Sequence, residues 1–249
     1  MDPCNLGRSD LWHNAGMSFS KNCTLGGLFV SLALVNVVSA AGPRDDSAPV
    51  QTITVNPGTS ANSIPFGADA SVAGPDGWYR YQQLIPGYLV QSMLEARNFE
   101  HSVQISGIGF IPVLNETFSV DQVEITLVET PFFTLTNSFD FNLAHTPRAP
   151  QIVFSGPVNS QLTAGKPLIL DLKKVAHWDL TWNLILQIRT KGLRQGSGSF
   201  QFGNNNPAIS RVYAPFSNPA VTRVEPGGLT VVFRVMPVVD RANIDEIDE

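Results

Sequence analysis

The fold class of this chain is decided by the stretch Val123-Glu-Ile-Thr-Leu127, in which apolar and polar side chains alternate strictly. Successive side chains of a β-strand point to opposite faces, so this pattern predicts a strand with one buried and one solvated face. The same period of two recurs in Leu168–Leu172 and in Leu184–Ile188. Half-buried strands of this kind indicate sheets that pack against a second apolar layer.

About ten short strands are expected, separated by turn residues. They lie at Gln51–Val55, Trp78–Leu84, Val103–Ile111, Val123–Leu127, Phe139–Asn142, Ile152–Phe154, Leu168–Leu172, Leu184–Ile188, Ser199–Phe202, Arg211–Tyr213 and Leu229–Val235. At most one short helix is expected, at Leu89–Phe99. The pattern predicts an all-β fold, an antiparallel β-sandwich or jelly roll, in a single domain over residues 51–238.

Glycines refine two of these strands. Gly107 and Gly109 indicate a bulge or a close approach of another backbone. Gly156-Pro157 is expected to end the strand that begins near Ile152.

Residues 17–41 have the features of a secretory signal peptide. Met17–Lys21 is short and positively charged, Leu25–Val38 is largely apolar, and Val38 and Ala40 are small side chains at the positions that signal peptidase reads. We therefore expect residues 1–40 to be a signal peptide, with Met17 as an alternative start and cleavage before Ala41. A buried core helix is the alternative interpretation. Cleavage predicts a secreted product, extracellular or periplasmic.

Polar segments flank the predicted domain. Residues 41–50 are expected to form a flexible lead-in, and the acidic residues 239–249 a disordered tail.

Charge and cysteine content exclude several classes of function. The chain has 249 residues and a net charge of −5 at pH 7, and it contains no run of basic residues, so nucleic acid is not an expected partner. Both cysteines, Cys4 and Cys23, lie in the predicted leader. The remaining chain therefore has no disulfide, no cysteine nucleophile and no cysteine-ligated metal.

Six segments together resemble a family of exported bacterial β-sandwich proteins, many of which end in a PEP-CTERM sorting signal. The six are Arg80-Tyr-Gln-Gln83, Ile105-Ser-Gly-Ile-Gly-Phe-Ile-Pro112, Ile152-Val-Phe-Ser-Gly-Pro157, Leu184-Ile-Leu-Gln-Ile-Arg189, Ser210-Arg-Val-Tyr213 and Gly228-Leu-Thr-Val-Val-Phe233. They occur in the family's order and cover most of residues 50–235. The resemblance implies an exported all-β protein and supplies no catalytic residues.

The end of the chain departs from the family's pattern. The typical member ends in Pro-Glu-Pro, an apolar helix and a basic cluster, whereas here the last apolar strand runs into an acidic tail. We therefore expect a product without a membrane anchor.

Catalytic and metal-binding patterns are weak. His101, His145 and His177 show no ligand spacing, and no Gly-x-Ser-x-Gly elbow occurs. Paired carboxylates for glycoside hydrolysis could come from several acidic residues, but Glu124 and Asp171 alternate with apolar neighbours and are expected to face solvent. No catalytic residue, metal site or cofactor is predicted. Calcium bound at Asp69 and Asp76 is an alternative that no motif supports.

Aromatic residues supply the best candidate for a binding site. Trp78, Arg80 and Gln82 lie on one predicted strand, and Trp178 and Asp179 lie together further along the chain. Sugar rings stack on aromatic faces while polar side chains bind the hydroxyl groups, so these five residues are the predicted ligand-binding set. The alternative is a core role, with alternation burying Tyr79 and Tyr81 and Trp182 joining the interior.

The sequence favours a secreted, non-enzymatic β-sandwich module that binds an extracellular polysaccharide or another cell-surface or matrix component. One alternative is an extracellular carbohydrate-active hydrolase. A second is a self-associating structural surface protein.

Overall fold

The computed structural model of the chain describes residues 50–62, 66, 77–95, 102–204, 206–213 and 223–238. All of them fall in the unit Asp46–Glu249. The predictions for the leader 1–40, for residues 41–49 of the lead-in, for the tail 239–249, and for Asp69, Asp76 and His101 lie outside the described residues.

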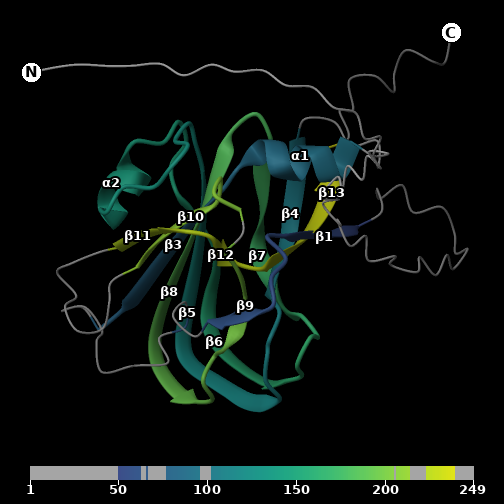
Figure 1. Ribbon diagram of the computed structural model, residues 1–249, viewed down its shortest axis with the longest axis vertical. Helices are drawn as coiled ribbons and strands as arrows, with labels where there is room; N and C mark the ends of the chain where they lie inside the picture. Colours follow the sequence, from purple (N-terminus) through teal and green to yellow (C-terminus); the bar gives the residue numbers. More distant parts are fainter. Residues whose placement is uncertain are drawn as a thin grey trace, which may run out of the picture. The chain divides into compact units, whose positions relative to one another are not determined.

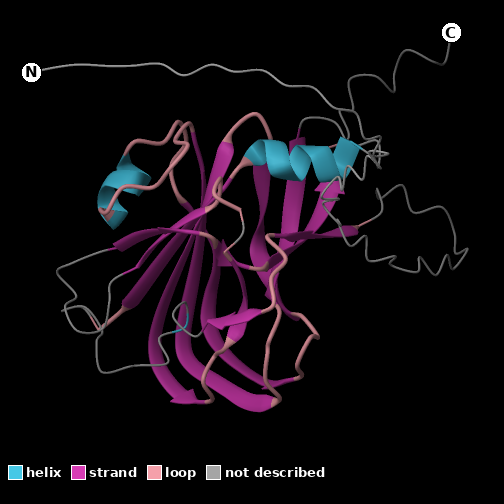
Figure 2. Ribbon diagram, viewed as in Figure 1, coloured by secondary structure: helices cyan, strands magenta, loops and turns pink. Residues whose placement is uncertain are grey.

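Two large antiparallel sheets form the protein, and a small third sheet joins them (Figures 1 and 2). The four-stranded sheet has the order β1 (Gln51–Val55), β13 (Val231–Pro237), β4 (Ser102–Phe110) and β7 (Leu168–Asp179). The six-stranded sheet has the order β11 (Arg223–Pro226), β10 (Ser210–Tyr213), β3 (Tyr79–Ile85), β8 (Asn183–Gln195), β5 (Glu116–Thr130) and β6 (Gln151–Leu162). The small sheet contains β12 (Gly228–Leu229), β9 (Phe200–Gly203) and β2 (Ser60–Asn62).

One hydrophobic core lies between the two large sheets. Alternate side chains of β3, β5 and β8, such as Tyr81, Ile125 and Ile188, are buried in the same cluster as Trp178 and Phe233 of the four-stranded sheet. The ring centroids of Trp178 and Phe233 are 6.0 Å apart. Burying the apolar face of each sheet against the other is the arrangement that the period of two requires. The predicted antiparallel β-sandwich is confirmed.

The glycines of β4 mark a bulge, as predicted. The pairing of β4 with β7 shifts register between Ile105 and Gly107. The shift reverses the phase of alternation, so Ile105 before it and Ile108 after it both point into the core. A Cβ on Gly107 would collide with the Arg234 side chain rather than with another backbone, whereas a Cβ on Gly109 would lie 3.0 Å from the carbonyl oxygen of Leu168.

The strand β6 is longer than predicted. It continues through Gly156-Pro157 to Leu162, and its register against β5 shifts between Val120 and Val123. A proline has no N–H to donate, but β6 is an edge strand of the six-stranded sheet, where one side of the backbone needs no partner. The prediction that these residues end the strand is therefore wrong.

The described residues form two helices, which lie at the margins of the sheets (Figure 2). The helix α1 (Gly87–Glu95) confirms the helical prediction, whose last residues are not described. The helix α2 (Phe139–Ala144) occupies a segment predicted to be a strand. Ser138 caps it, because its side chain accepts a hydrogen bond of 3.3 Å from Phe141 N. Phe139 and Leu143, four residues apart, both pack on the six-stranded sheet, so the true period is helical.

Candidate ligand-binding face

The six-stranded sheet has an outer face, turned away from the four-stranded sheet, on which side chains of β3, β8 and β5 form three cross-strand rows. The charged row is Arg80, Arg189 and Glu124; the amide row is Gln82, Gln187 and Thr126; and the apolar row is Leu84, Ile185 and Val128. The face therefore changes from charged to apolar along the strands.

The apolar row is closed to solvent. Leu84, Ile185 and Val128 are buried in a second hydrophobic cluster together with Val212 and Leu135. The segment that carries α2 covers this end of the face (Figure 1). No ligand can reach these side chains while the segment stays in place.

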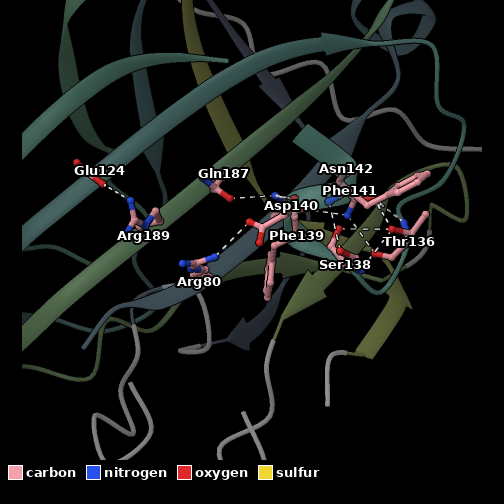
Figure 3. A network of polar contacts seen from close by, with 11 residues as sticks. Arg80, Glu124, Thr136, Ser138, Phe139, Asp140, Phe141, Asn142, Gln187 and Arg189 are labelled. Atoms are coloured by element: carbon pink, nitrogen blue, oxygen red, sulfur yellow. Dashed lines mark hydrogen bonds and ion pairs between the residues drawn. The ribbon is translucent and has the colours of Figure 1, made fainter. Parts of the chain in front are cut away.

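The amide row fastens α2 to the sheet. Gln82 Nε2 donates to Gln187 Oε1 at 2.9 Å and to Phe139 O at 3.0 Å, and Gln82 Oε1 accepts from Asn142 Nδ2 at 3.0 Å. Asn142 Oδ1 in turn accepts from the backbone N–H and the hydroxyl of Thr136, as part of the network in Figure 3. Gln82, a member of the predicted ligand-binding set, is buried, and its amide holds the cover in place.

The charged row is the part of the face that solvent reaches. Arg189 Nη1 lies 2.9 Å from Glu124 Oε2, and Arg80 Nη1 lies 3.4 Å from Asp140 Oδ1 on α2, with both pairs drawn in Figure 3. The exposed fraction of the side chain is 34% for Arg80 and 90% for Asp140. Glu124, which was expected to face solvent, is only 15% exposed because it pairs with Arg189.

Trp78 directly precedes β3 and is the next outward residue after Arg80, so it extends the charged end of the face. The Arg189 guanidinium lies over the Trp78 ring, 4.5 Å from the ring centroid, in a cation–π contact. The indole is half-buried, so part of it remains accessible. The side chain of Lys191, the next outward residue of β8 after Arg189, runs beside Gly77. Trp78 and Arg80 are thus brought together with Arg189, Glu124 and Lys191.

Trp178 and Asp179 lie elsewhere, at the end of β7 in the four-stranded sheet. Trp178 is fully buried, and its Nε1 donates to Trp182 O at 3.0 Å. Asp179 Oδ1 accepts from the N–H and the hydroxyl of Thr181, which shapes the turn into β8. The structure therefore does not bring the five predicted residues together, because Arg80 and Gln82 belong to the six-stranded sheet and Trp178 and Asp179 to the four-stranded sheet.

Sequence reasoning missed four members of the charged end: Arg189, Glu124, Lys191 and Asp140. The signal for Arg189 was present in the alternation of Leu184–Ile188, which places residue 189 on the outward side. Asp140 could not be found, because its position depends on α2 replacing the predicted strand.

A second polar cluster joins the two sheets at one end. Glu129, which is buried, accepts a hydrogen bond of 2.6 Å from Asp179 N and pairs with Arg148 at 3.2 Å. Arg148 Nη1 also lies 3.2 Å from His177 Nδ1. The hydrogen bond from the Asp179 backbone N–H on β7 to the Glu129 carboxylate on β5 indicates a structural clamp. Among the described residues, no group of three or more His, Cys, Asp or Glu side chains is placed to hold a metal ion.

No protein-family model, curated protein or solved structure matches the chain. The resemblance carried by the six sequence segments therefore stays a prediction. None of the helices in the described part of the chain is long and apolar enough to cross a membrane.

Proposed function

We propose that this protein is an exported, non-enzymatic module that binds a carbohydrate at the charged end of the outer face. The observation that carries the proposal is the half-buried Trp78, held against Arg189 beside a row of polar side chains. An indole offers an apolar surface to a sugar ring, and guanidinium and carboxylate groups bind hydroxyl groups with defined geometry.

Rigidity of the charged end supports this use. Trp78 adjoins β3, and Arg80, Arg189 and Glu124 project from paired strands of the sheet interior. Groups held in place before binding lose little conformational freedom when a ligand arrives. A half-open sheet face also suits a polymer, because chain ends need not enter a closed pocket.

A glycan array probed with the purified chain tests the proposal, followed by calorimetric titration of each hit. We expect Trp78→Ala to weaken binding at least tenfold, because the stacking surface is lost. Tyr88→Ala is the matched control, since Tyr88 is an exposed aromatic on α1 outside the face. Equal binding by the parent and Trp78→Ala, with both folded by circular dichroism, would refute the site.

Export rests on the leader-like segment Met17–Ala40 and needs its own test. N-terminal sequencing of the protein recovered outside the inner membrane is expected to begin at Ala41. Protein that keeps the segment and stays in the cytosol would contradict export, and this result would have no bearing on the proposed carbohydrate site.

A further inference from the structure

We infer that the carbohydrate bound at the charged end is acidic, and that its carboxylate binds Arg80 at the position where the Asp140 carboxylate now lies. The inference rests on the proposed function and names the chemical class of the ligand. Asp140 is then an internal competitor, which the ligand displaces.

Two arginines face each other across neighbouring strands. Arg80 and Arg189 are direct partners in the register of β3 and β8, and both point outward. Directly opposed like charges on one sheet face are destabilising, and the charged row contains them side by side. Anions between or beside the two guanidinium groups relieve this repulsion.

The two arginines receive their anions from different sources. Arg189 pairs with Glu124, its own partner in the register of β5 and β8, at 2.9 Å. Arg80 pairs with Asp140, which comes from α2 outside the sheet, at 3.4 Å. Glu124 is therefore a permanent part of the sheet, whereas Asp140 is brought to Arg80 by the segment that covers the face.

The Arg80–Asp140 pair is the one that a ligand can replace. The Asp140 side chain is 90% exposed, and water screens an ion pair at such a surface, so the pair contributes little to stability. A ligand carboxylate can form two parallel hydrogen bonds with a guanidinium, a stronger arrangement than a single contact at 3.4 Å. Exchange of one carboxylate for another leaves the opposed arginines neutralised.

Spacing along the strand fits one acidic sugar unit. Trp78 and Arg80 are two residues apart on the same face, which places them roughly 7 Å apart along the strand. A sugar ring on the indole can thus direct a ring carboxylate toward Arg80. Lys191, which is exposed and runs beside Gly77, adds a further positive charge for the next unit of an acidic polymer.

Calorimetric titration tests the inference with three ligands: trigalacturonate, its neutral methyl ester and dextran sulfate. Asp140→Asn is expected to raise the affinity for trigalacturonate three- to tenfold, because the competitor loses its charge. Arg80→Gln is expected to lower the affinity for trigalacturonate at least tenfold. Arg80→Lys is expected to have an affinity between those of the parent and Arg80→Gln. The methyl ester is expected to bind more weakly and to respond to neither change.

The four-stranded sheet offers a matched control pair. Arg234 and Asp171 form an ion pair whose side chains are 34% and 81% exposed, close to the values for Arg80 and Asp140. Arg234→Gln and Asp171→Asn make the same charge changes on the other sheet. They are expected to alter the affinity less than twofold, which separates a local effect from the net charge of the protein.

The outcomes distinguish this inference from the proposed function. Unchanged or weaker trigalacturonate binding by Asp140→Asn overturns the inference, and so does equal binding of the acid and its ester. If Trp78→Ala still abolishes binding in either case, the carbohydrate site stands. If only dextran sulfate binds, and Asp140→Asn raises the affinity for it, the bound anion is a sulfate. That result overturns the inference that the ligand is a carboxylate. Loss of every glycan signal overturns both proposals.

Discussion

Gln83 and Leu229 exchange two hydrogen bonds although they are 146 residues apart: Leu229 N donates to Gln83 Oε1 at 2.7 Å, and Gln83 Nε2 donates to Leu229 O at 3.1 Å. A side-chain amide on β3 thus takes the place of a partner strand for the backbone of β12. Tyr81 OH also donates to Gln83 Oε1, at 2.7 Å. The contact ties the small sheet to the six-stranded sheet inside the core.

Replacing Gln83 with leucine is expected to destabilise the protein by about 3 kcal/mol, because the buried backbone of Leu229 loses its two shortest hydrogen bonds and keeps only the longer contacts with Tyr81 OH at 3.3 Å and Asn56 Nδ2 at 3.5 Å. For a domain of this size such a loss lowers Tm by roughly 6–12 °C. Urea denaturation measures the change. Gln161→Leu is the control, since Gln161 bonds to Thr117 at the exposed edge, and it is expected to cost less than about 0.5 kcal/mol. Equal effects of the two substitutions would contradict the role of Gln83.

Alkaline pH is expected to destabilise the protein through Tyr79 and Tyr81. Burial raises the pKa of both phenols above the ordinary value of 10.0, with neighbouring tyrosines adding to the rise at Tyr79. Above about pH 10 the unfolded chain releases these protons and the folded chain keeps them, so the free energy of unfolding falls as pH rises. Below that pH the two phenols are protonated in both the folded and the unfolded state, and their full contribution to the free energy of unfolding is present.

Tyr79→Phe tests this dependence. It is expected to remove about 1.4 kcal/mol per pH unit from the slope between pH 10 and 12, since one group no longer titrates differently in the two states. Denaturation series at pH 8, 10, 11 and 12 measure the slope. Identical slopes in the variant and the parent would count against buried, protonated Tyr79.

Gly87→Ala is expected to destabilise more than Gly165→Ala. A Cβ on Gly87 would collide with the carbonyl oxygens of Leu180 and Trp182, so the backbone at the start of α1 would have to move, at about 3 kcal/mol. Gly165 has a φ of 76° but no heavy atom within 4 Å of an added Cβ, so only conformational strain of about 1 kcal/mol is expected. Thermal melts rank the two, and the reverse order would disprove the close approach at Gly87.

Arg194→Gln is expected to raise the pKa of Asp121. Arg194 Nε donates to Asp121 Oδ1 at 2.9 Å, and this hydrogen bond holds the pKa of the carboxyl below its usual value. A lowered pKa in the folded state stabilises the protein above the pKa of the unfolded chain, and the contribution is lost as pH falls. A carboxyl-carbon NMR titration measures the change. Lys174→Gln, on β7, is the control, and a matching shift there would show a general charge effect.

Strands with a clear period of two could be predicted from local sequence. In Val123–Leu127 and Leu184–Ile188 every second side chain enters the core between the sheets, as the strand period requires. The outward residues Ile185 and Gln187 were expected to be solvated but are buried as well, because the segment that carries α2 covers them. The segment Phe139–Asn142 was misassigned because four residues are too few to separate a period of two from one of 3.6. Ser138 as a cap and the pair Phe139 and Leu143 were the signals that favoured the helix.

The candidate site was half predictable for a related reason. Trp78 and Arg80 were placed on one outward face because Tyr79 and Tyr81 alternate with them, and both tyrosines are buried. Pairing Trp78 with Trp178 required knowledge of which sheet each strand joins, and strand order depends on contacts between residues far apart in the chain.

The amino-acid sequence by itself determined the all-β class, most strand positions and which side of β3 faces outward, because these depend on the two-residue repeat of a single strand. Tertiary structure alone decided that Arg80 lies opposite Arg189, that Asp140 reaches Arg80 and that Trp178 is enclosed in the core. The register between strands and the docking of α2 set these distances, and both depend on packing among segments that no local pattern connects.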